Sequence, residues 1–318
     1  MPENYRILVT GAAGFIGSHT AEYFAKAGHE VYGVDNFSDY YDIDLKKRNV
    51  KDIEAAGVTF LKADLTGGLQ GRLSENMDYI FHYAAQPGIS PDVSLKEYVQ
   101  NNIFATQNLL DWAKQESSGL KLFVNIATSS IYGKEATLPE TAPPEPISFY
   151  GTTKLAAEQL VLGRQRSDNL PACSLRLYSV YGPRERPEKL YTKLIKSIFD
   201  GTAFPLFKGS EKHSRSFTYV GDIIKGVSAV IGRENAVNGQ IINIGSDKEY
   251  TTQEGIELIE KIIGKKAQIE VTPPRPGDQL RTTALIDKAR KLLEYDPSTS
   301  FEEGLRKQVE WYRENFVG

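Results

Sequence analysis

The sequence predicts an α/β protein, built on a doubly wound parallel sheet with a smaller lobe interleaved with it. In the first two-thirds of the chain, short apolar runs rich in β-branched residues alternate with longer helical patterns, which is typical of parallel strands joined by crossover helices. Several runs, such as YIFHYAA and LFVNIA, are almost continuously apolar, as in strands covered on both faces. With 318 residues, 40% of them hydrophobic, the chain is long enough to bury such a sheet.

The expected elements follow one another along the chain. The strands are expected at residues 6–10, 30–34, 59–62, 79–82, 122–126, 172–177 and 241–244. Helical spacing covers residues 17–27, 94–115 and 150–166. The last two helices are long enough to offer an apolar face to another copy of the chain, so we expect a homodimer through them.

The alternation of apolar runs and helical segments becomes irregular after about Gly182. Prolines interrupt short segments there, and charges cluster in RERPEK and PPRPGDQLR. We expect residues 182–218 and 248–318 to form the smaller lobe. Residues 1–181 are expected to build the sheet domain, and residues 219–247 to return to it, because the apolar run at 241–244 still has the character of a sheet strand.

Composition limits the possible partners. A formal charge of −3 and a pI near 5.9 give no basic field that would collect nucleic acid or anionic lipid. Neither a leader nor a long apolar run is visible, and the single cysteine, Cys173, lies in an apolar stretch, so we expect it in the core and the chain in the cytoplasm. His19, His29, His82 and His213 have no ligand-like spacing, so no metal site is expected.

A glycine motif opens the first predicted helix. RILVTGAAGFIGSH places Gly11, Gly14 and Gly17 directly after a strand, where glycines permit a tight turn, close approach to a pyrophosphate and close helix packing. A purely structural turn has the same spacing. Asp35 ends the second apolar run about twenty residues later. A carboxylate at this place accepts hydrogen bonds from both ribose hydroxyls of the adenosine and repels a 2′-phosphate. The pattern therefore predicts a Rossmann-type site for NAD rather than NADP.

Further cofactor candidates lie at the ends of neighbouring strands. Asp64 can reach the adenine edge, while Ala84 and Ala85 leave room for the dinucleotide. Ordinary strand-end chemistry explains these residues equally well. The remaining cofactor candidates are Phe15, Ile16, Asn36, Leu65 and Asn102.

A candidate catalytic group follows in ATSSIYG and YGTTK. Tyr150 and Lys154 are four residues apart on a predicted helix, so both project from one face. An ammonium near the phenol favours phenolate, and we expect it to lower the tyrosine pKa towards working pH. Thr128, at a strand end, is our preferred partner for the substrate hydroxyl, with Ser129 and Ser130 beside it. Each pattern alone is common on helix surfaces and in turns, whereas their order behind the glycine motif indicates a site.

Six motifs, GAAGFIG, HYAAQPG, ATSSIYG, YGTTK, LRLYSVYGPRERP and SFTYVGDI, resemble the extended short-chain dehydrogenase/reductase family of nucleotide-sugar epimerases and dehydratases. They occur in family order over nearly the whole chain. The resemblance implies a lobe that keeps NAD tightly bound and a smaller lobe that grips a nucleoside diphosphate. It also implies that Tyr150 takes a proton from a sugar hydroxyl, usually at C4, as hydride passes to NAD, while Lys154 binds the nicotinamide ribose.

The residues after Thr128 distinguish the reactions of this family. Similar dehydratases carry Asp-Glu where this chain has Ser129 and Ser130, because loss of the C6 hydroxyl needs an acid and a base. Epimerisation needs neither, since the keto sugar turns over and receives hydride on its other face. The resemblance therefore favours a 4-epimerase.

The sugar is suggested by VYGPRERPEK, in which Arg184 and Arg186 bracket a turn. This motif resembles that of UDP-glucuronate 4-epimerases, where Arg186 would face the C6 carboxylate and Ser179 would assist it. Two departures keep UDP-glucose or UDP-galactose, with or without an N-acetyl group, open as substrates. Ile89 and Ser90 stand where an arginine is usual, and Ser179 replaces a threonine or asparagine.

By the same resemblance, Arg215, Arg275 and Asp278 match positions that hold the diphosphate and ribose of the substrate. Uridine is inferred from its frequency in the family. Two other readings remain open: a non-catalytic NAD(H)-sensing regulator and a net oxidoreductase that releases NADH.

Overall fold

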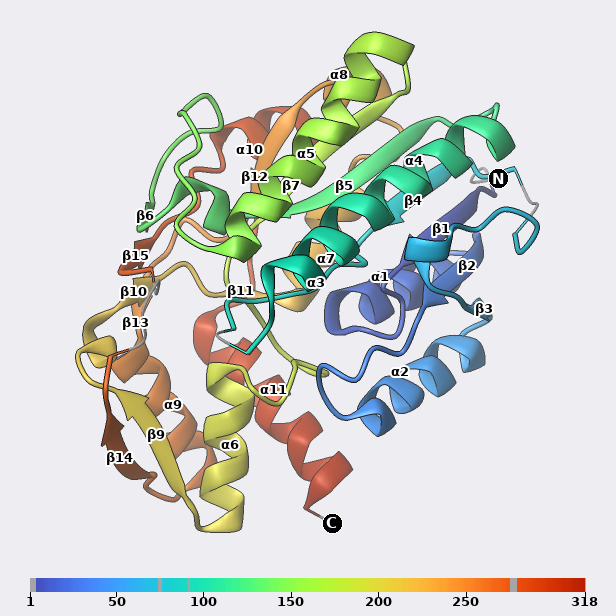
Figure 1. The fold of residues 1–318 in the computed structure, drawn as a ribbon. Helices are drawn as coiled ribbons and strands as arrows, with labels where there is room; N and C mark the ends of the chain where they lie inside the picture. The colour runs from blue at the N-terminus through green and yellow to red at the C-terminus, as the bar shows by residue number, and fades with distance from the viewer. Residues whose placement is uncertain (1–3, 74–75, 91, 275–278, 318) are drawn as a thin grey trace.

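A seven-stranded parallel sheet forms the centre of the protein in the computed structural model, which describes residues 4–73, 76–90, 92–274 and 279–317 (Figure 1). The strands are β1 (Arg6–Thr10), β2 (Glu30–Asp35), β3 (Thr59–Lys62), β4 (Tyr79–His82), β5 (Leu122–Thr128), β7 (Ala172–Leu177) and β12 (Ile241–Ile244). Their order in the sheet is β12-β7-β5-β4-β1-β2-β3. The predicted fold class and all seven strands are confirmed, although β2 is one residue longer and β5 two residues longer than predicted.

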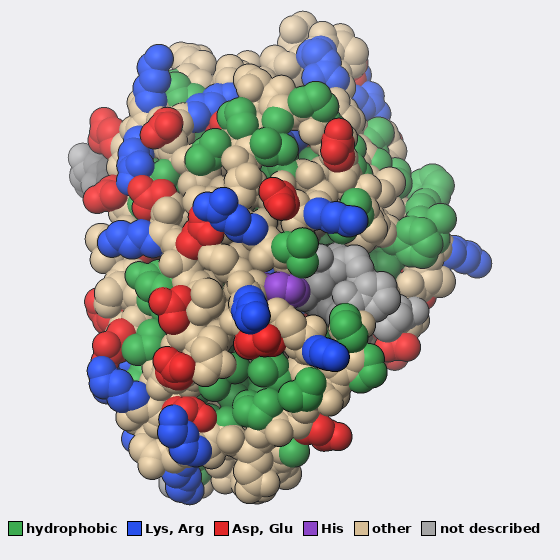
Figure 2. All heavy atoms as spheres, turned by 90° about the vertical axis from the view of Figure 1, so that its left-hand side faces the viewer, with side chains coloured by type: hydrophobic (Ala, Val, Ile, Leu, Met, Phe, Trp, Pro, Cys, Tyr) green, Lys and Arg blue, Asp and Glu red, His purple; other side chains and the backbone are tan. Residues whose placement is uncertain are grey.

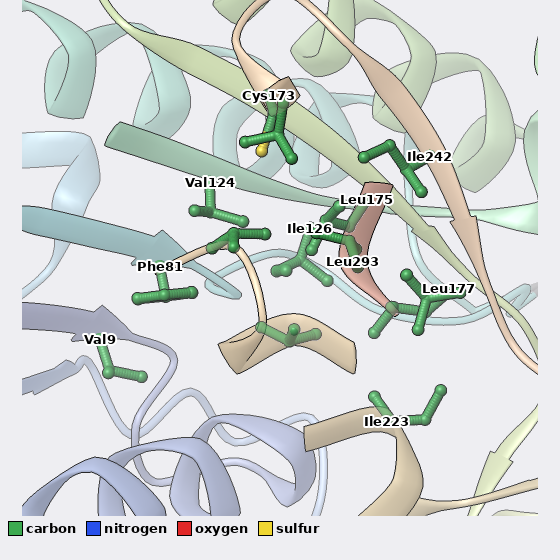
Figure 3. Packing of buried hydrophobic residues seen from close by; sticks show 14 of the residues in the cluster. Val9, Phe81, Val124, Ile126, Cys173, Leu175, Leu177, Ile223, Ile242 and Leu293 are labelled. Carbon is green, nitrogen blue, oxygen red and sulfur yellow. The ribbon is translucent and has the colours of Figure 1, made fainter. Parts of the chain in front are cut away.

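The two faces of the sheet belong to two separate cores, as the alternation of side chains along a strand requires. Ile7 and Val9 of β1 lie in one core, and Leu8 lies in the other. Figure 3 shows the first core, where apolar side chains from neighbouring strands meet. Cys173 of β7 is fully buried in it, which confirms its predicted place.

Helices cover both faces of the sheet (Figure 1). One face is covered by α1 (Phe15–Lys26), α2 (Ile43–Ala55), α7 (Val220–Ser228) and α10 (Asp287–Leu293). The other is covered by α4 (Ala105–Glu116) and α5 (Phe149–Asp168). The helices predicted at 17–27 and 150–166 are thus present, with bounds shifted by one or two residues.

The single helix predicted at 94–115 is wrong in detail. The segment consists of α3 (Leu95–Val99), a π-helical turn η2 (Gln100–Phe104) and α4. Ser94 and Glu97 begin α3 with a reciprocal capping box, in which each side chain accepts a hydrogen bond from the backbone of the other residue. A π turn adds one residue to a helical turn, which the apolar spacing of the sequence does not reveal.

The smaller lobe has an aromatic core of its own, which includes Tyr191, Phe204 and Phe301. Its larger elements are α6 (Leu190–Asp200), β9 (Ala203–Phe207), α9 (Thr252–Ile263), β14 (Gln268–Thr272) and α11 (Phe301–Phe316). The shorter ones are β8 (Val180–Tyr181), η4 (Ser210–Lys212), β10 (Ser214–Arg215), β11 (Thr218–Tyr219), β13 (Tyr250–Thr251) and β15 (Arg281–Thr282). The sheet domain adds η1 (Leu65–Gly67), η3 (Ser129–Tyr132), β6 (Glu135–Ala136) and α8 (Glu234–Val237).

The lobe boundaries stay a prediction, and strand pairing supports the interleaving. Two elements lie on the other side of the predicted boundaries: β8 packs in the core of the smaller lobe, and α10 packs on the large sheet. β12 pairs with β7 of the large sheet, while β14 pairs with β9 in a separate two-stranded sheet. β6 joins β15 in the small four-stranded sheet. On the face drawn in Figure 2, basic and acidic side chains are interspersed. Among the described residues, no helix combines the length and apolarity needed to span a bilayer, and no group of His, Cys, Asp or Glu side chains is arranged to hold a metal ion.

Candidate functional site

A cavity of about 530 Å³ lies at the carboxyl ends of the central strands and extends to the smaller lobe. Ligands of open parallel sheets bind at this edge, where the strand order reverses, and here the reversal falls between β1 and β4. The predicted site residues that line the cavity are Gly11, Gly14, Phe15, Ile16, Gly17, Asp35, Asn36, Asp64, Leu65, Ala84, Ala85, Thr128, Ser129, Ser130, Tyr150, Lys154, Ser179, Arg186 and Arg215. Arg275 and Asp278 lie outside the described residues.

The glycine loop between β1 and α1 forms a hollow, here called the glycine cradle, that larger side chains would fill. Gly11 has φ +69°, and a Cβ there would lie 2.9 Å from the backbone nitrogen of Ala84. A Cβ on Gly17 would lie 2.2 Å from the Gly11 carbonyl oxygen. Gly14 caps α1 without a side-chain hydrogen bond, so the helix presents its first backbone N–H groups to the cavity. These features fit the pyrophosphate of a dinucleotide.

Asp35 lies at the end of β2, where it is almost buried. Burial raises the pKa of its carboxyl group, and the ammonium of Lys46 acts in the opposite direction. Its Oδ2 accepts a hydrogen bond from the backbone nitrogen of Ala13 at 3.2 Å, and Oδ1 accepts one from Phe37 at 2.8 Å. The carboxylate is therefore held in place beside the glycine loop.

Lys46 is a cavity residue that our sequence reasoning missed. Its Nζ donates to the backbone oxygen of Ser38 at 2.8 Å and to the Ser38 hydroxyl at 3.0 Å. Next to it, Asn36 Nδ2 donates to Asp64 Oδ2 at 3.0 Å, which joins the ends of β2 and β3. The only sequence signal for Lys46 is its place in α2, a helix that follows Asp35 closely.

A buried chain of hydrogen bonds supports the floor of the cavity. The backbone N–H of Ala84 donates to Thr10 Oγ1, whose hydroxyl lies 2.8 Å from His82 Nδ1. His82 Nε2 lies 2.9 Å from Thr106 Oγ1, which donates to the backbone oxygen of Asn102. These directions place the proton of His82 on Nε2. Burial lowers the pKa of His82 to about 3, so the ring is neutral and structural.

Asn102 does not line the cavity, although we predicted that it binds the cofactor. Its Oδ1 accepts a hydrogen bond from the backbone nitrogen of Gln86 at 2.6 Å. Its Nδ2 donates to Thr153 Oγ1 at 2.9 Å. The π turn η2 thus orients Asn102 to connect the loop after β4 with α5, and its neighbour Asn101 faces the cavity instead.

The start of α5 brings the candidate catalytic residues together. Ser148 caps the helix by accepting a hydrogen bond from the backbone nitrogen of Gly151 at 3.1 Å. A Cβ on Gly151 would lie 2.6 Å from the backbone oxygen of Ser130, so the helix packs directly on the end of β5. Tyr150 consequently lies within hydrogen-bonding reach of Thr128.

The pKa values of Tyr150 and Lys154 differ from what the sequence predicted. Burial raises the pKa of Tyr150, and the groups that oppose this effect are the Thr128 hydroxyl and the guanidinium of Arg186. Burial also lowers the pKa of Lys154 to about 8, against the raising effect of Glu158. We predicted that Lys154 lowers the pKa of the phenol. In the protein without a ligand this prediction is wrong, because desolvation outweighs the neighbouring charges.

The two arginines of GPRER have separate places. Arg184 adopts φ +65° and points out of the cavity, where it pairs with Glu22 of α1 at 2.8 Å and with Asp52 of α2 at 3.0 Å. Arg186 lines the cavity, with Nη1 2.9 Å from Glu188 and its guanidinium 5.6 Å from the centre of the Tyr40 ring. Of these two arginines, Arg186 is the one that lines the cavity at the strand ends.

Basic and aromatic side chains line the part of the cavity that the smaller lobe forms. Arg215 donates to the backbone oxygen of Gln279 at 2.8 Å. Lys189, at the start of α6, lines the cavity and is exposed, and the nearby Arg186 lowers the pKa of its amine. Sequence reasoning missed Lys189, because only its place beside the cavity distinguishes it from other exposed lysines. The aromatic lining is Tyr191, Phe204, Phe207 and Phe217.

The glycine cradle, the buried carboxylate after β2 and the Tyr150/Lys154 pair define an NAD-linked α/β enzyme, whose cavity continues from the cofactor site to the smaller lobe. The chain belongs to the NAD dependent epimerase/dehydratase family, whose model matches residues 7–245. The predicted family and the NAD cofactor are thereby confirmed.

Three similar proteins span almost the whole chain. An uncharacterized UDP-glucose epimerase, YtcB of Bacillus subtilis (strain 168), is 37% identical and covers 98% of this chain and 99% of its own length. A UDP-glucuronate 4-epimerase of Thermodesulfobacterium geofontis is 35% identical, with 97% and 96% covered. The solved UDP-glucuronic acid 4-epimerase of Bacillus cereus, in complex with UDP-glucuronic acid and NAD, superposes with a TM-score of 0.90 at 34% identity and covers 98% of this chain and 100% of that one.

Proposed function

We propose that the chain is an NAD-dependent nucleotide-sugar 4-epimerase, an isomerase, with UDP-glucuronate as its substrate. The observation that carries the proposal is the meeting of Tyr150, Lys154 and Thr128 at the junction of the glycine cradle and the basic cavity. Relatives named UDP-glucuronate 4-epimerase support the choice of sugar.

In this mechanism, bound NAD would supply a reversible hydride acceptor beside C4 of the sugar. Tyr150 accepts the C4 hydroxyl proton on its phenolic oxygen and gives it back. Thr128 holds that hydroxyl in line with the phenol, because its Oγ1 reaches Tyr150. Lys154 holds the nicotinamide ribose with a charged ammonium. Asp35 accepts hydrogen bonds from the adenosine ribose hydroxyls, and the N-terminus of α1 holds the pyrophosphate.

The two positions after Thr128 carry hydroxyl groups rather than the acid and base that elimination needs, which favours epimerisation. Ser129 and Ser130 follow Thr128 in the short helix η3, and Thr128 Oγ1 accepts a hydrogen bond from the backbone nitrogen of Ser130 at 3.1 Å. Neither serine can protonate a leaving hydroxyl at C6. A keto sugar would then turn over in the cavity and present its other face to the cofactor.

Arg186 binds the C6 carboxylate, with Ser179 beside it. A guanidinium forms two parallel hydrogen bonds with a carboxylate, which fixes its plane. A 4-keto uronic acid is a β-keto acid and loses carbon dioxide readily, so an epimerase must restrain that group. Lys189 and Arg215 hold the diphosphate, and Arg275 and Asp278, outside the described residues, complete the nucleotide site.

A homodimer and a cytoplasmic location complete the proposal. Leu95 and Phe104, from the segment that leads into α4, are 46% and 52% exposed, and Phe149 at the start of α5 is 54% exposed. Together they offer apolar surface to another copy of the chain. The location rests on composition alone and stays a prediction.

UDP-glucose is the second candidate substrate. Arg186 already pairs with Glu188, and Ser90 stands where similar uronate epimerases carry an arginine. The test is to incubate the purified protein, without added NAD, with UDP-glucuronate, UDP-glucose and UDP-N-acetylglucosamine separately, and to follow products by NMR. A galacto-configured product from UDP-glucuronate supports the proposal. The corresponding 4-epimer from a neutral sugar only selects the second candidate, and a pentose product indicates decarboxylation. No product with any of the three sugars indicates either another nucleotide or a non-catalytic NAD(H)-sensing regulator.

A further inference from the structure

The guanidinium of Arg186 has a carboxylate of the chain itself beside it. Its Nη1 lies 2.9 Å from Oε1 of Glu188, which follows two residues later in the same loop. Nη1 is buried, yet among the described residues no acceptor lies where its N–H bonds point. Glu188 therefore offsets the charge of Arg186 but leaves part of its hydrogen-bonding capacity unused.

The surroundings hold Arg186 in place, whereas Glu188 has room to move. The side chain of Arg186 is 14% exposed and that of Glu188 is 41% exposed. The Tyr40 hydroxyl lies within hydrogen-bonding reach of Arg186 and of Ser90. A Cβ on Gly88 would lie 3.5 Å from Arg186 Nη2, so the loop after β4 also packs against the guanidinium. A half-exposed carboxylate can turn into water at little cost, because exposed ion pairs contribute little to stability.

The other acidic residue of this loop cannot take the place of Glu188. Glu185 is 4% exposed. It accepts hydrogen bonds from Thr192 Oγ1 at 3.1 Å and from Gln308 Nε2 at 2.7 Å, which hold it against α6 and α11. Of the two carboxylates, Glu188 is thus the one that both contacts Arg186 and can leave it.

We propose that Glu188 is a specificity-determining residue, which pairs with Arg186 while the sugar is neutral and gives up the guanidinium to a sugar that carries a carboxylate. The inference rests on the proposed function, because it concerns the sugar that the cavity accepts. A neutral sugar leaves the ion pair intact. A uronate has to displace Glu188 before Arg186 can bind it through two parallel hydrogen bonds. Glu188 thus lowers the preference of the cavity for uronates.

The test measures the affinity of the NAD-bound protein for UDP-glucuronate and for UDP-glucose by titration calorimetry, in a Tyr150→Phe background that prevents turnover. Glu188→Gln removes the charge and keeps the length of the side chain. It should strengthen the binding of both ligands through their diphosphates, so the readout is the ratio of the two Kd values. This ratio should shift by about two- to fivefold in favour of UDP-glucuronate, since no half-exposed ion pair has to be broken.

Two controls show whether the shift passes through Arg186. Glu211→Gln removes one negative charge from η4, next to the cavity residue Ser210, and should keep the original ratio. In an Arg186→Met background, Glu188→Gln should no longer change the ratio, because the two residues act through one contact. An unchanged ratio in Glu188→Gln, or an equal shift with and without Arg186, would overturn the proposal.

A readout that needs no sugar separates this inference from the proposed function. Phenylglyoxal modifies arginine side chains, and peptide mass spectrometry gives the rate at Arg186. The rate should rise in Glu188→Gln, because the guanidinium loses the carboxylate beside it. If the protein binds neither UDP-sugar, the proposed function fails, and the modification rate still shows whether Glu188 occupies Arg186. Equal rates in the wild type and in Glu188→Gln would exclude the inference.

Discussion

The phenol of Tyr150 lies in a place where burial makes it a weaker acid, so its neighbours have to favour its ionised form. Thr128 and Arg186 act in that direction within the protein itself. If Tyr150 is the base, Tyr150→Phe should lower kcat by about 10²–10⁴, the usual contribution of a general base. The checks are the NMR assay and the NAD content, which should be unchanged.

The control is Tyr23→Phe, which removes a hydroxyl from a half-exposed surface position on α1. It should retain full activity. Full activity of Tyr150→Phe with any nucleotide-sugar would exclude the tyrosine as the base. It would favour instead the alternative that the chain is an NAD(H)-sensing regulator.

Arg186 and Arg184 form a natural matched pair, because the chain places one inside the cavity and the other outside it. Arg186→Ala should reduce kcat/KM for UDP-glucuronate by about 10- to 100-fold, since a hydrogen bond to a charged group contributes about 1.5–3 kcal/mol. It should also increase the pentose by-product. NMR of the product mixture measures both.

Arg184→Ala should instead lower Tm through the loss of its pairs with Glu22 and Asp52. Its kcat/KM should stay within about twofold of wild type, because interactions outside the site do not change transition-state binding. Equal losses in both variants would mean that Arg186 has no special role towards the carboxylate.

His82 makes stability depend on pH. Its folded-state pKa, about 3, lies below the ordinary value of 6.5, so the unfolded state binds the proton more readily. This contribution to stability is complete above about pH 6.5 and is lost as pH falls towards 3. Between pH 7.5 and pH 5, the free energy of unfolding should fall by about 2 kcal/mol from this group.

Urea unfolding at the two pH values measures this change. The variant His82→Gln cannot titrate, so its stability should change less over the same interval even though it is less stable throughout. An equal change in both proteins would show that other groups cause the dependence.

At the scale of elements, the glycine loop joins β1 and α1 by contacts that allow no side chain. Gly17→Ala should release NAD and lower Tm, because the added Cβ would lie 2.2 Å from the Gly11 carbonyl oxygen. Absorbance of bound NAD in the purified protein and a melting curve measure the two effects.

Gly163→Ala in α5 is the control, since a Cβ there meets nothing within 4 Å. Alanine has the higher helix propensity, so this variant should gain up to about 1 kcal/mol in stability. Retention of NAD by Gly17→Ala would contradict the close packing of α1.

The strands were predictable because buried parallel strands have near-continuous apolar runs, and β1, β3, β4, β7 and β12 begin and end where the pattern does. The break at η2 was not predictable, since a π turn depends on contacts such as those of Asn102 with the loop after β4. The parts of the site that were predictable are those with a fixed spacing in the sequence, namely the glycine motif and the pair of Tyr150 and Lys154. Lys46 and Lys189 were missed because only the tertiary fold brings them to the cavity.

At the scale of the whole molecule, the cavity requires both lobes, and the chain passes between them several times. The positions of Arg184 and Arg186 show what spacing alone cannot predict, because only the resemblance to known epimerases singled out Arg186. They are two residues apart in one loop. Arg184 has a left-handed backbone conformation and points outward, whereas Arg186 lines the cavity.

The exposed apolar residues near α4 and α5 predict a homodimer. Leu95→Asp combined with Phe104→Asp should give a monomer, because charges would replace apolar contacts at the interface. Size-exclusion chromatography with light scattering measures the mass. Val271→Asp on β14, at a side chain that is 66% exposed, is the control and should leave the dimer intact. A wild-type monomer would exclude the interface.

The π turn between α3 and α4 makes the length of this segment critical. Deleting one residue from Gln100–Phe104 would restore a regular α-helix, but it would rotate everything on one side of the deletion by about 100° relative to the other. Either the Asn102 amide would lose Gln86 and Thr153, or the buried face of α4 would turn away from the sheet. Insertions and deletions should therefore be rarer here than substitutions among descendants of this sequence, and an engineered library should keep the length of this segment fixed.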